Sequence, residues 1–364
     1  MGCRRHMREK VDFAMIGWKL DYSRNRVLLN HTRLKFRSFE IPETSFLRRV
    51  IHVIYLIVKI IISVDTKIIY IPAFNQVNAP LILIIFRITG KKIVTDMLIS
   101  DYDTLVNDRK LASKISLRAF RFYLNDWLCL KLSNLIICDT ENHKQFFEVF
   151  FKVRSKKMIV IPVGAEDIFK PMSFYSQENI FNILFYGGFS PLHGIEHIIE
   201  AANILKDHKD IRFTLIGSGQ TRENMIQLAT EYQLNNINFI DSKPYLTLPL
   251  DIAKADVGLG IFGASEKVKR VIPNKVYQLA ACGKPIITLR TPAIEAMFDG
   301  GENILLVYER DDLGKQIADN ILLLKENRAL REKIAISVTK LIEDGKNHND
   351  ISLFFEKILI ESSA

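Results

Sequence analysis

Short apolar runs alternate with amphipathic stretches along nearly the whole chain, and this alternation begins twice. In the first half we predict strands at Val11–Trp18, Lys67–Phe74, Lys92–Met97, Leu135–Asp139 and Met158–Val163. In the second half we predict strands at Asn182–Phe189, Arg212–Gly217, Ile237–Asp241, Asp256–Ile261, Pro285–Leu289 and Ile304–Val307. Helical stretches such as Ser23–Lys35 and Phe46–Val64 fill the segments between them. The pattern favours right-handed strand–helix–strand crossovers and parallel sheets covered by helices on both faces.

The length of 364 residues exceeds what one comfortable core supports. The polar segment Pro171–Gln177 separates the two alternating halves and is the predicted linker. We therefore predict an α/β protein of two Rossmann-like, doubly wound domains, residues 1–170 and 171–345. In such sheets ligands bind outside the carboxyl ends of the strands, so the cleft between two facing domains is the expected site.

Basic residues are concentrated at the N-terminus. Residues 1–60 carry thirteen Lys and Arg against five Asp and Glu, which is 13 − 5 = +8 of a total formal charge of +9. Such a segment favours either nucleic acid or an anionic membrane as partner. No helix-turn-helix, zinc spacing or basic–aromatic pattern accompanies the charge, so we expect no nucleic-acid partner.

Val50–Val64 is the most apolar stretch of the chain, but its fifteen residues include His52 and Lys59. This is shorter than the roughly 20 residues that span a bilayer. Two interpretations stay open: a buried core helix, or a helix that lies partly in the membrane interface beside Arg48 and Arg49.

The four cysteines are scattered, without a CxxC pair, at Cys3, Cys129, Cys138 and Cys282. Met1–Lys10 is charged and lacks the apolar segment of a signal peptide. Both features favour a cytoplasmic location with reduced thiols.

A cationic loop precedes the helix that Pro273 opens and Gly283 closes. Lys267, Lys269, Arg270 and Lys275 surround the point where that helix begins. A helix N-terminus offers unpaired backbone N–H groups and the positive end of a dipole, which together bind anions such as phosphate. The alternative is a solvated basic loop.

Two more loops follow strands in the second half. Gly187 and Gly188 let a ligand approach the backbone, and Gly194 opens the next helix. Gly217 and Gly219 form a tight strand-to-helix turn, which is a weak signal alone. Three such loops in consecutive strand–helix units, one of them strongly cationic, favour a nucleotide diphosphate as ligand.

Several segments resemble the GT-B glycosyltransferases of family 4. They are FYGGFSPLHGIEHIIEAANIL, RFTLIGSGQ, PNKVYQLAACGKPIIT and GENILLVYERDD in the second half, and YSRNRVLL, TDMLISDYDTLVNDRK and IPVGAEDIFKP in the first. The resemblance covers most of residues 11–345. It implies two Rossmann-like domains facing a central cleft, and a helix within residues 346–364 that returns to the first domain.

The resemblance also implies an activity. Members of the family transfer a sugar, here of hexosyl type, from a nucleotide-diphosphate sugar with retention of configuration. They need no metal and no cofactor, so cationic protein groups stabilise the diphosphate leaving group. For this chain the implied acceptor is a cell-envelope polysaccharide or a lipid-linked glycan. The implied location is cytoplasmic, with peripheral contact to the anionic inner face of the cell membrane.

This chain departs from the common family pattern. Gly188 and His193 occupy positions where an Arg and a Lys are usual, and Arg270 and Gln278 stand where two glutamates are usual. Gln278 can still hydrogen-bond ribose hydroxyls. We hypothesise that the cationic role of the first loop has moved to Lys267, Arg270 and Lys275.

These considerations predict the site residues. We expect catalytic roles for Arg270, Lys275 and Asp96, and no metal ligands. We expect the donor to be bound by Gly187, Gly188, His193, Gly217, Gly219, Lys267, Asn274 and Gln278. Two residues have structural alternatives, namely His193 as a surface residue and Asn274 as a helix N-cap. Asp96 is expected at a strand end facing the cleft, whereas Asp101 and Asp103 in the following loop have solvated loop carboxylates as their alternative.

Three other classes of function compete with the transferase. A non-catalytic relative would keep the fold as a binding module, and a nucleotide-sugar epimerase of GT-B fold would act without an acceptor. A nicotinamide-dependent oxidoreductase is disfavoured, because Gly217-Ser-Gly219 is followed by Gln-Thr-Arg222 and lacks the third glycine of that fingerprint.

Overall fold

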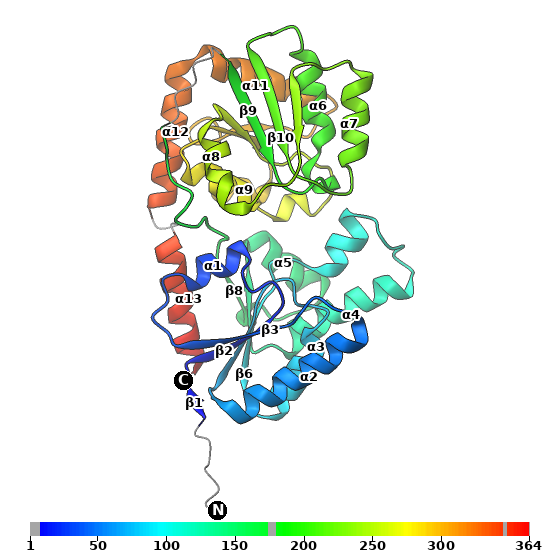
Figure 1. Cartoon of the computed structure of the whole chain (residues 1–364), viewed down its shortest axis with the longest axis vertical. Coiled ribbons are helices and arrows are strands. Elements are labelled where there is room, and N and C mark those ends of the chain that lie inside the picture. The colour runs from blue at the N-terminus through cyan, green and yellow to red at the C-terminus, as the bar shows by residue number, and fades with distance from the viewer. Residues whose placement is uncertain (1–7, 174–179, 345–347, 364) are drawn as a thin grey trace, which may run out of the picture. The chain divides into compact units, whose positions relative to one another are not determined.

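The computed structural model describes residues 8–173, 180–344 and 348–363. The chain divides into two compact units (Figure 1). Unit 1 comprises residues 1–162 and 348–364, and unit 2 comprises residues 163–347. Each is an α/β unit with one six-stranded, wholly parallel sheet, as the alternating sequence pattern predicts.

The sheet of unit 1 has the strand order β3-β2-β5-β6-β7-β8. Its strands are β2 (Phe13–Gly17), β3 (Phe36–Glu40), β5 (Ile68–Ile71), β6 (Lys92–Asp96), β7 (Leu135–Cys138) and β8 (Met158–Val160), and β1 (Glu9–Lys10) pairs separately with β4 (Val64–Asp65). Its helices are α1 (Ser23–Leu29), α2 (Phe46–Ser63), α3 (Ala79–Ile88), α4 (Leu117–Leu132), α5 (Glu141–Phe150) and α13 (His348–Ser363), with a π-helix at Asp103–Asp108.

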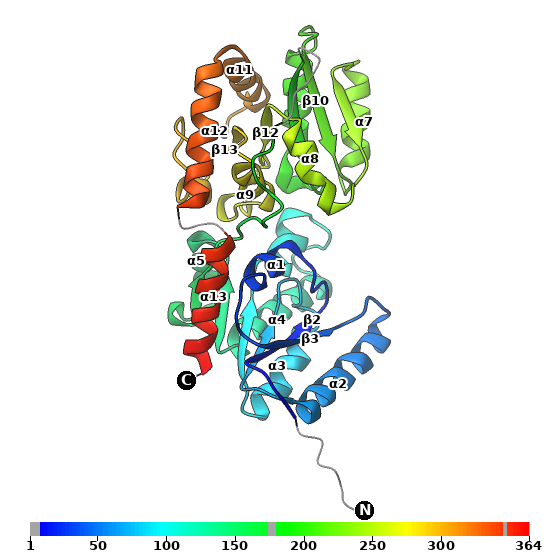
Figure 2. The same cartoon turned by 60° about the vertical axis from the view of Figure 1, so that its left-hand side comes forward.

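The two faces of this sheet bury different apolar layers, because successive side chains of a strand point to opposite faces. Ala14 and Ile16 of β2 belong to the layer that includes the inner residues of α2 and α3. Phe13 and Met15 belong to the opposite layer, which is covered by α1 and α13. Phe355 of α13 packs there against Phe13, with ring centroids 6.4 Å apart. The last helix therefore completes the core of unit 1, alongside α1 (Figure 2).

Unit 1 differs from the sequence expectation most clearly at one strand of its main sheet, and the short strands β1 and β4 and the π-helix were not predicted either. The helix predicted over Ser23–Lys35 ends at Leu29, and the strand β3, which was not predicted, follows it. This strand lies at the edge of the sheet, and Phe39 is its one fully buried residue. An edge strand with so little burial lacks the alternating apolar signal by which strands are recognised.

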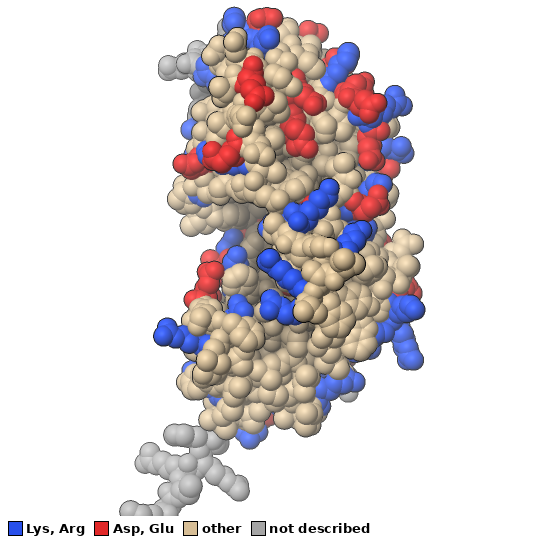
Figure 3. All heavy atoms as spheres, turned by 90° about the vertical axis from the view of Figure 1, so that its right-hand side faces the viewer, with Lys and Arg blue, Asp and Glu red and all other residues tan. Residues whose placement is uncertain are grey.

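The helix α2 contains the apolar stretch Val50–Val64 up to Ser63 and buries one of its faces in the unit 1 core. Its buried residues are Val53, Leu56, Ile57 and Ile60. Within the described residues, no helix is both long enough and apolar enough to cross a membrane. The opposite face of α2 is exposed, on the side of the molecule that Figure 3 shows.

The sheet of unit 2 has the strand order β11-β10-β9-β12-β13-β14. Its strands are β9 (Phe181–Tyr186), β10 (Ile211–Ile216), β11 (Ile237–Ile240), β12 (Val257–Leu259), β13 (Ile286–Leu289) and β14 (Leu305–Val307). Its helices are α6 (Ile195–Ile204), α7 (Arg222–Glu231), α8 (Leu248–Ala253), α9 (Asn274–Ala281), α10 (Pro292–Glu295), α11 (Leu313–Glu326) and α12 (Arg328–Glu343).

The strand order of unit 2 reverses at β9, which lies between β10 and β12. In open parallel sheets the loops that leave the carboxyl ends of the two strands at such a reversal separate, and the crevice between them binds ligands. Here those loops are residues 187–194 after β9 and residues 260–273 after β12. The fold thus places two of the three predicted ligand loops at the switch point of the sheet.

The units divide between residues 162 and 163, ahead of the boundary predicted at 170. Residues 163–169 join unit 2 because their side chains pack there. The Phe169 ring contacts the Tyr245 ring, with centroids 5.6 Å apart, and Glu166 accepts a hydrogen bond from the Tyr245 hydroxyl at 2.6 Å. Within the predicted linker Pro171–Gln177, residues 174–177 lie outside the described residues.

Candidate functional site

The first two glycine loops of unit 2 are joined to each other through their backbones. The N–H of Phe189 donates to the Ser218 carbonyl at 2.8 Å, and the N–H of Gly187 donates to Ile216 at 3.0 Å. At Gly217, φ is +140°, and a Cβ atom would lie 2.0 Å from the Gly187 carbonyl oxygen. A side chain at 217 would therefore push the loops apart, so this glycine is required by the contact between them.

The loop after β9 is also fixed to the segment after β12. The N–H of Phe262 donates to the His193 carbonyl at 3.0 Å. A Cβ atom at Gly194 would lie 2.4 Å from the backbone carbon of Phe262. The backbone of residues 187–194 is thus held from both sides, while a Cβ at Gly188 would meet only the edge of the His193 ring, at 3.9 Å. Space beside Gly188 remains open to a ligand.

Lys275, in the first turn of α9, points toward this loop. Its side chain is buried, with 5 % of the residue exposed, and its Nζ has no hydrogen-bond partner among the described residues. The Nζ lies 3.7 Å from the centroid of the Phe185 ring. A Cβ on Gly187 would lie 3.3 Å from both Cε and Nζ of Lys275. Gly187 therefore leaves room for the ammonium group directly beside the backbone of the loop.

The electrostatic cost of this arrangement is large. Burial lowers the pKa of the Lys275 ammonium well below the ordinary value for lysine. The Phe185 ring offers its negative face, which compensates a buried cation only in part. An anion bound beside Gly187 would supply the missing opposite charge and raise this pKa.

His193 shares the Phe185 ring with Lys275. It is buried, 9 % exposed, and packs edge-on against Phe185 with ring centroids 5.5 Å apart. Its Nδ1 lies 3.1 Å from the Ser190 hydroxyl oxygen. The alternative of a surface histidine is therefore wrong. The structure brings His193, Lys275 and the glycines of the first loop together around one aromatic ring.

Gln278, one turn further along α9, is part of a directional chain of hydrogen bonds. The Tyr186 hydroxyl donates to Gln278 Oε1 at 3.0 Å, and Gln278 Nε2 donates to the Tyr245 hydroxyl at 2.7 Å. Tyr245 donates in turn to Glu166. A glutamate at 278 could not donate to Tyr245, whereas an amide both accepts and donates. This chain of hydrogen bonds gives a local reason for Gln at position 278, and the carboxylate at its end belongs to Glu166.

The cationic segment after β12 separates into two groups. Lys267 is buried and Arg270 is partly buried, at the two ends of a short 3₁₀ turn in which the Arg270 N–H donates to the Lys267 carbonyl. Lys269 instead forms a more exposed ion pair with Glu266 at 2.7 Å. Pro273 is the N-cap of α9, so Asn274 is its first helical residue and not the cap.

Asp96 belongs to unit 1 and is closed off from solvent, with 1 % of the residue exposed. Its Oδ2 accepts a hydrogen bond at 2.6 Å from Nε of Arg24, which is fully buried. The two other guanidinium nitrogens donate to the carbonyls of Pro162 and Ile161. Burial raises the pKa of Asp96, and the Arg24 charge opposes this shift. In this structure Asp96 is half of a buried ion pair, and its second oxygen, Oδ1, is buried without a hydrogen-bond partner among the described residues.

The other carboxylates near Asp96 also hold local structure. Asp103 is buried and accepts a hydrogen bond from the Asn107 side chain at 3.0 Å. Asp126, on α4, accepts from the Ser100 hydroxyl and from the N–H groups of residues 101 and 102. Burial, reinforced by the charge of Asp101, raises the pKa of Asp126 to about 8. Across the described residues, no three His, Cys, Asp or Glu side chains gather as a metal site would require.

Comparison with known proteins identifies the segment that carries the glycine loops and Lys275. Residues 166–341 match the family model of the glycosyl transferases group 1. We call residues 166–341 the group 1 segment after this match. The match ends within α12 and covers nearly all of unit 2.

Two curated relatives of this chain are glycosyltransferases by name. The chain is 28 % identical over 142 residues to the probable glycosyltransferase WbjE of Pseudomonas aeruginosa, which covers 37 % of this chain and 33 % of that protein. It is 30 % identical over 103 residues to the putative colanic acid biosynthesis glycosyl transferase WcaI of Escherichia coli K12, which covers 28 % of this chain and 24 % of that protein. The matches thus span about a third and a quarter of these relatives.

The whole chain resembles a solved structure, Anabaena Alr3699/HepE in complex with UDP and glucose. The TM-score is 0.72 at 15 % identity, covering 96 % of this chain and 100 % of that one. At this identity the likeness shows the fold alone. The predicted fold class, GT-B with two Rossmann-like domains, is confirmed.

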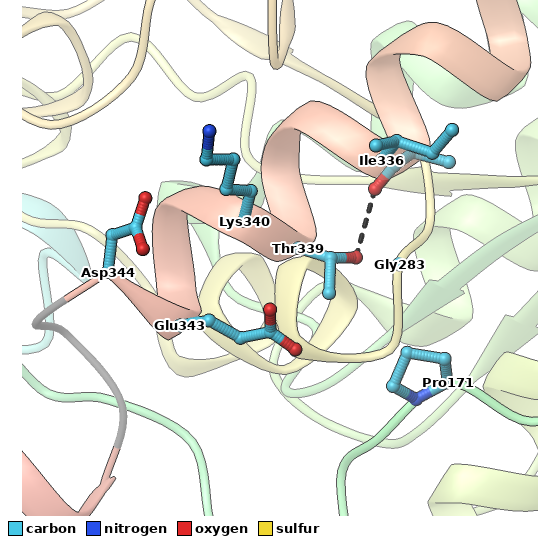
Figure 4. A pocket seen from close by; sticks show the side chains of 8 residues that line it. Pro171, Gly283, Ile336, Thr339, Lys340, Glu343 and Asp344 are labelled. Atoms are coloured by element: carbon cyan, nitrogen blue, oxygen red, sulfur yellow. Dashed lines mark hydrogen bonds between the residues drawn. The ribbon is translucent and has the colours of Figure 1, made fainter.

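A separate hollow of about 650 Å³ lies at the other end of α9 in the group 1 segment. Figure 4 shows Pro171 and Gly283 on one side of it and Thr339 and Glu343 of α12 on the other. Gly283 follows the C-terminus of α9, whereas Lys275 lies in the first turn. This hollow is therefore distinct from the crevice at the switch point.

Several residues of this candidate site could not be predicted as site residues from the sequence pattern. Phe185 has the pattern of an ordinary strand residue, and Glu166 and Tyr245 lie in loops far from Gln278. The Lys275–Phe185 contact joins positions 90 residues apart. The Tyr245–Glu166 pair is 79 residues apart and the Gln278–Tyr245 pair is 33 residues apart. The one available signal is Gln278, which stands where a glutamate is usual. An amide at this position implies a partner that accepts a hydrogen bond, which a glutamate could not donate.

Proposed function

We propose that this protein transfers a sugar from a nucleotide-diphosphate sugar to a cell-envelope polysaccharide or lipid-linked glycan. The observation that carries the proposal is the Lys275 ammonium, buried beside Gly187 with no hydrogen-bond partner among the described residues. A buried ammonium without a counter-charge lowers the stability of the fold, unless a bound anion supplies that charge. The diphosphate of a sugar donor is an anion that fits a glycine-lined crevice at a sheet switch point.

The proposed chemistry is positioning combined with electrostatic stabilisation. Breaking the bond between sugar and diphosphate leaves negative charge on the leaving oxygen, which Lys275, assisted by Lys267 and Arg270, would neutralise. The cationic side chains take the part that a metal ion has in other transferases. Retention of configuration and membership of family 4 follow from the quoted motifs as part of this proposal.

Acceptor and location belong to the same proposal. The name of the relative WcaI assigns that protein to colanic acid biosynthesis, and the solved structure of HepE holds UDP, so a uridine donor is the first to test. We propose a cytoplasmic enzyme in peripheral contact with the membrane that carries its acceptor. The exposed apolar face of α2 supports this part.

Calorimetry of UDP, GDP and their sugars against wild type and Lys275→Met tests the donor site. We expect the variant to bind the preferred diphosphate roughly 10- to 100-fold more weakly, the loss of one charge-assisted interaction. Lys269→Met is the matched control, because it removes an equal charge from the same segment but from the pair with Glu266. Equal affinity for wild type and Lys275→Met would overturn the assignment.

A transfer assay separates the enzyme from its non-catalytic and epimerase alternatives. Wild-type protein is incubated with the preferred radiolabelled donor and a lipid extract from envelope membranes. Label entering the lipid fraction supports the transferase. Donor that binds but is not consumed supports a binding module, and isomerised donor without acceptor supports an epimerase.

A further inference from the structure

The helix α2 is apolar on both of its faces. The inner face is covered by the unit 1 core, but the outer face is exposed, with residues exposed by 45 to 69 %. These outer residues are Leu47, Ile51, Ile54, Tyr55, Val58 and Ile62. Their spacing places them on a single stripe at helical periodicity. A helix that is hydrophobic all round is normally buried all round, so this stripe lacks a covering partner.

The neighbouring helices extend this surface. In unit 1, α3 packs against both α2 and α4, so the three helices form one layer. The exposed apolar residues of α3 and α4 are Ile84, Ile88, Leu117, Phe120, Leu124 and Trp127. In Figure 3, which shows this side of the molecule, the surface of unit 1 is mostly uncharged, with Lys and Arg around it and some Asp or Glu at one edge. An exposed apolar surface formed by three helices exceeds the scattered apolar residues usual on a soluble protein.

The charges of the three helices have one sign. Together α2, α3 and α4 carry seven basic residues, namely Arg48, Arg49, Lys59, Arg87, Arg118, Arg121 and Lys131. Their single acidic residue, Asp126, is fully buried and bound to Ser100. No acidic side chain on these helices would therefore repel an anionic surface. Positive charge beside an exposed apolar helix face is the combination that binds a bilayer with anionic lipids.

We propose that the outer surface of α2, α3 and α4 docks on a bilayer that contains anionic phospholipid. The apolar stripe of α2 enters the interface in the plane of the membrane, and the arginines of α2 and α4 lie at the phosphate groups. Trp127 and Tyr55 have the amphipathic rings that favour this depth. The inference deepens the proposed function by naming the surface and the lipid class, and it rests on that function for the membrane-borne acceptor.

Vesicle flotation with the full chain tests the docking. Wild type and the triple variant Ile51→Gln/Ile54→Gln/Val58→Gln are mixed with vesicles of phosphatidylcholine, with and without phosphatidylglycerol. We expect wild type to float with the anionic vesicles and the variant to bind at least about tenfold more weakly. The matched control is Leu250→Gln/Leu323→Gln/Ile336→Gln, three similarly exposed apolar residues of unit 2. Equal flotation of wild type and the α2 variant overturns the proposal.

A second variant, Arg118→Gln/Arg121→Gln, separates charge from apolar insertion. We expect it to lose several-fold in affinity for anionic vesicles, and we expect salt to weaken wild-type binding more than binding of this variant. UDP affinity of every variant is measured in parallel, so a failed donor site is distinguished from a failed docking surface. If wild type forms a dimer that the α2 substitutions dissociate, without floating on vesicles, a second copy covers the surface and the proposal is overturned.

Discussion

Asp96 of unit 1 and Lys275 of unit 2 are both buried charged side chains, and their surroundings differ in one respect. Asp96 has the Arg24 guanidinium at 2.6 Å, and Arg24 in turn reaches two backbone carbonyls. Among the described residues the Lys275 ammonium has no hydrogen-bond partner, and it lies over the face of the Phe185 ring. A buried charge with its counter-charge inside the fold stabilises structure once formed, whereas one without it is poised for a ligand. Burial alone therefore does not mark a functional group.

Removing the compensation in unit 1 should have the largest effect. Asp96→Asn leaves the fully buried Arg24 guanidinium without its counter-charge, so we expect the free energy of unfolding to fall by about 3 to 5 kcal/mol. Urea unfolding followed by circular dichroism measures it. The double variant Arg24→Leu/Asp96→Leu should recover much of the loss. A single variant as stable as wild type would mean that the pair contributes nothing.

Removing the uncompensated charge in unit 2 should act in the opposite direction. Lys275→Met replaces a buried ammonium with an apolar side chain of similar length, so we expect the ligand-free protein to gain about 1 to 3 kcal/mol. Differential scanning calorimetry without nucleotide measures this gain. A destabilised Lys275→Met would show that an interaction within the fold already satisfies the ammonium, and the comparison would fail.

A conservative change distinguishes charge from geometry in the unit 1 pair. Arg24→Lys keeps the positive charge but cannot reach Asp96 and both carbonyls with one planar fork. We expect a loss of about 1 to 2 kcal/mol in the free energy of unfolding, less than for Asp96→Asn. If Arg24→Lys costs as much as Asp96→Asn, the hydrogen-bond geometry matters more than the charge.

The lowered pKa of Lys275 predicts a pH dependence of donor binding. The anion requires the ammonium form, and the fraction of free protein in that form falls as pH rises through the lowered pKa. Affinity for UDP should therefore decrease with rising pH, by at most about tenfold per pH unit or ~1.4 kcal/mol. Titration calorimetry above pH 7 avoids ionisation of the nucleotide itself. Lys275→Met should lack this slope, and an equal slope in both proteins would assign it to another group.

The same lysine gives stability a related dependence. Its folded pKa lies below the ordinary value near 10.4, so between the two values the unfolded chain binds more protons. The ligand-free protein should accordingly gain stability as pH rises through that window, and Lys275→Met should not.

The sequence predicted most of the fold because parallel sheets buried on both faces leave continuous apolar runs. It missed β3, an edge strand with one buried residue, and the π-helix after β6, whose Asp103 and Thr104 give no apolar periodicity. Both elements owe their conformation to neighbours distant in the chain.

The candidate site was predictable in its loops and not in its partners. The glycines and Lys275 belong to local motifs, so their positions follow from the strand–helix pattern. Arg24 and Asp96, however, meet across 72 residues, whereas the sequence predicted Asp96 as a strand-end carboxylate that faces the cleft. The sequence supplies the charged residues, but which of them are neutralised inside the fold depends on tertiary contacts.

The position of α13 in the core of unit 1 has a consequence for biosynthesis. Phe355 and Ile351 fill the layer over Phe13 and Tyr70, yet they are synthesised after the whole of unit 2. Unit 1 therefore cannot close until α13 has been synthesised, while unit 2 can fold from a continuous segment in the meantime. A nascent chain stalled before residue 348 should expose this apolar layer to chaperones and proteases, and expression of residues 1–162 alone should yield aggregates.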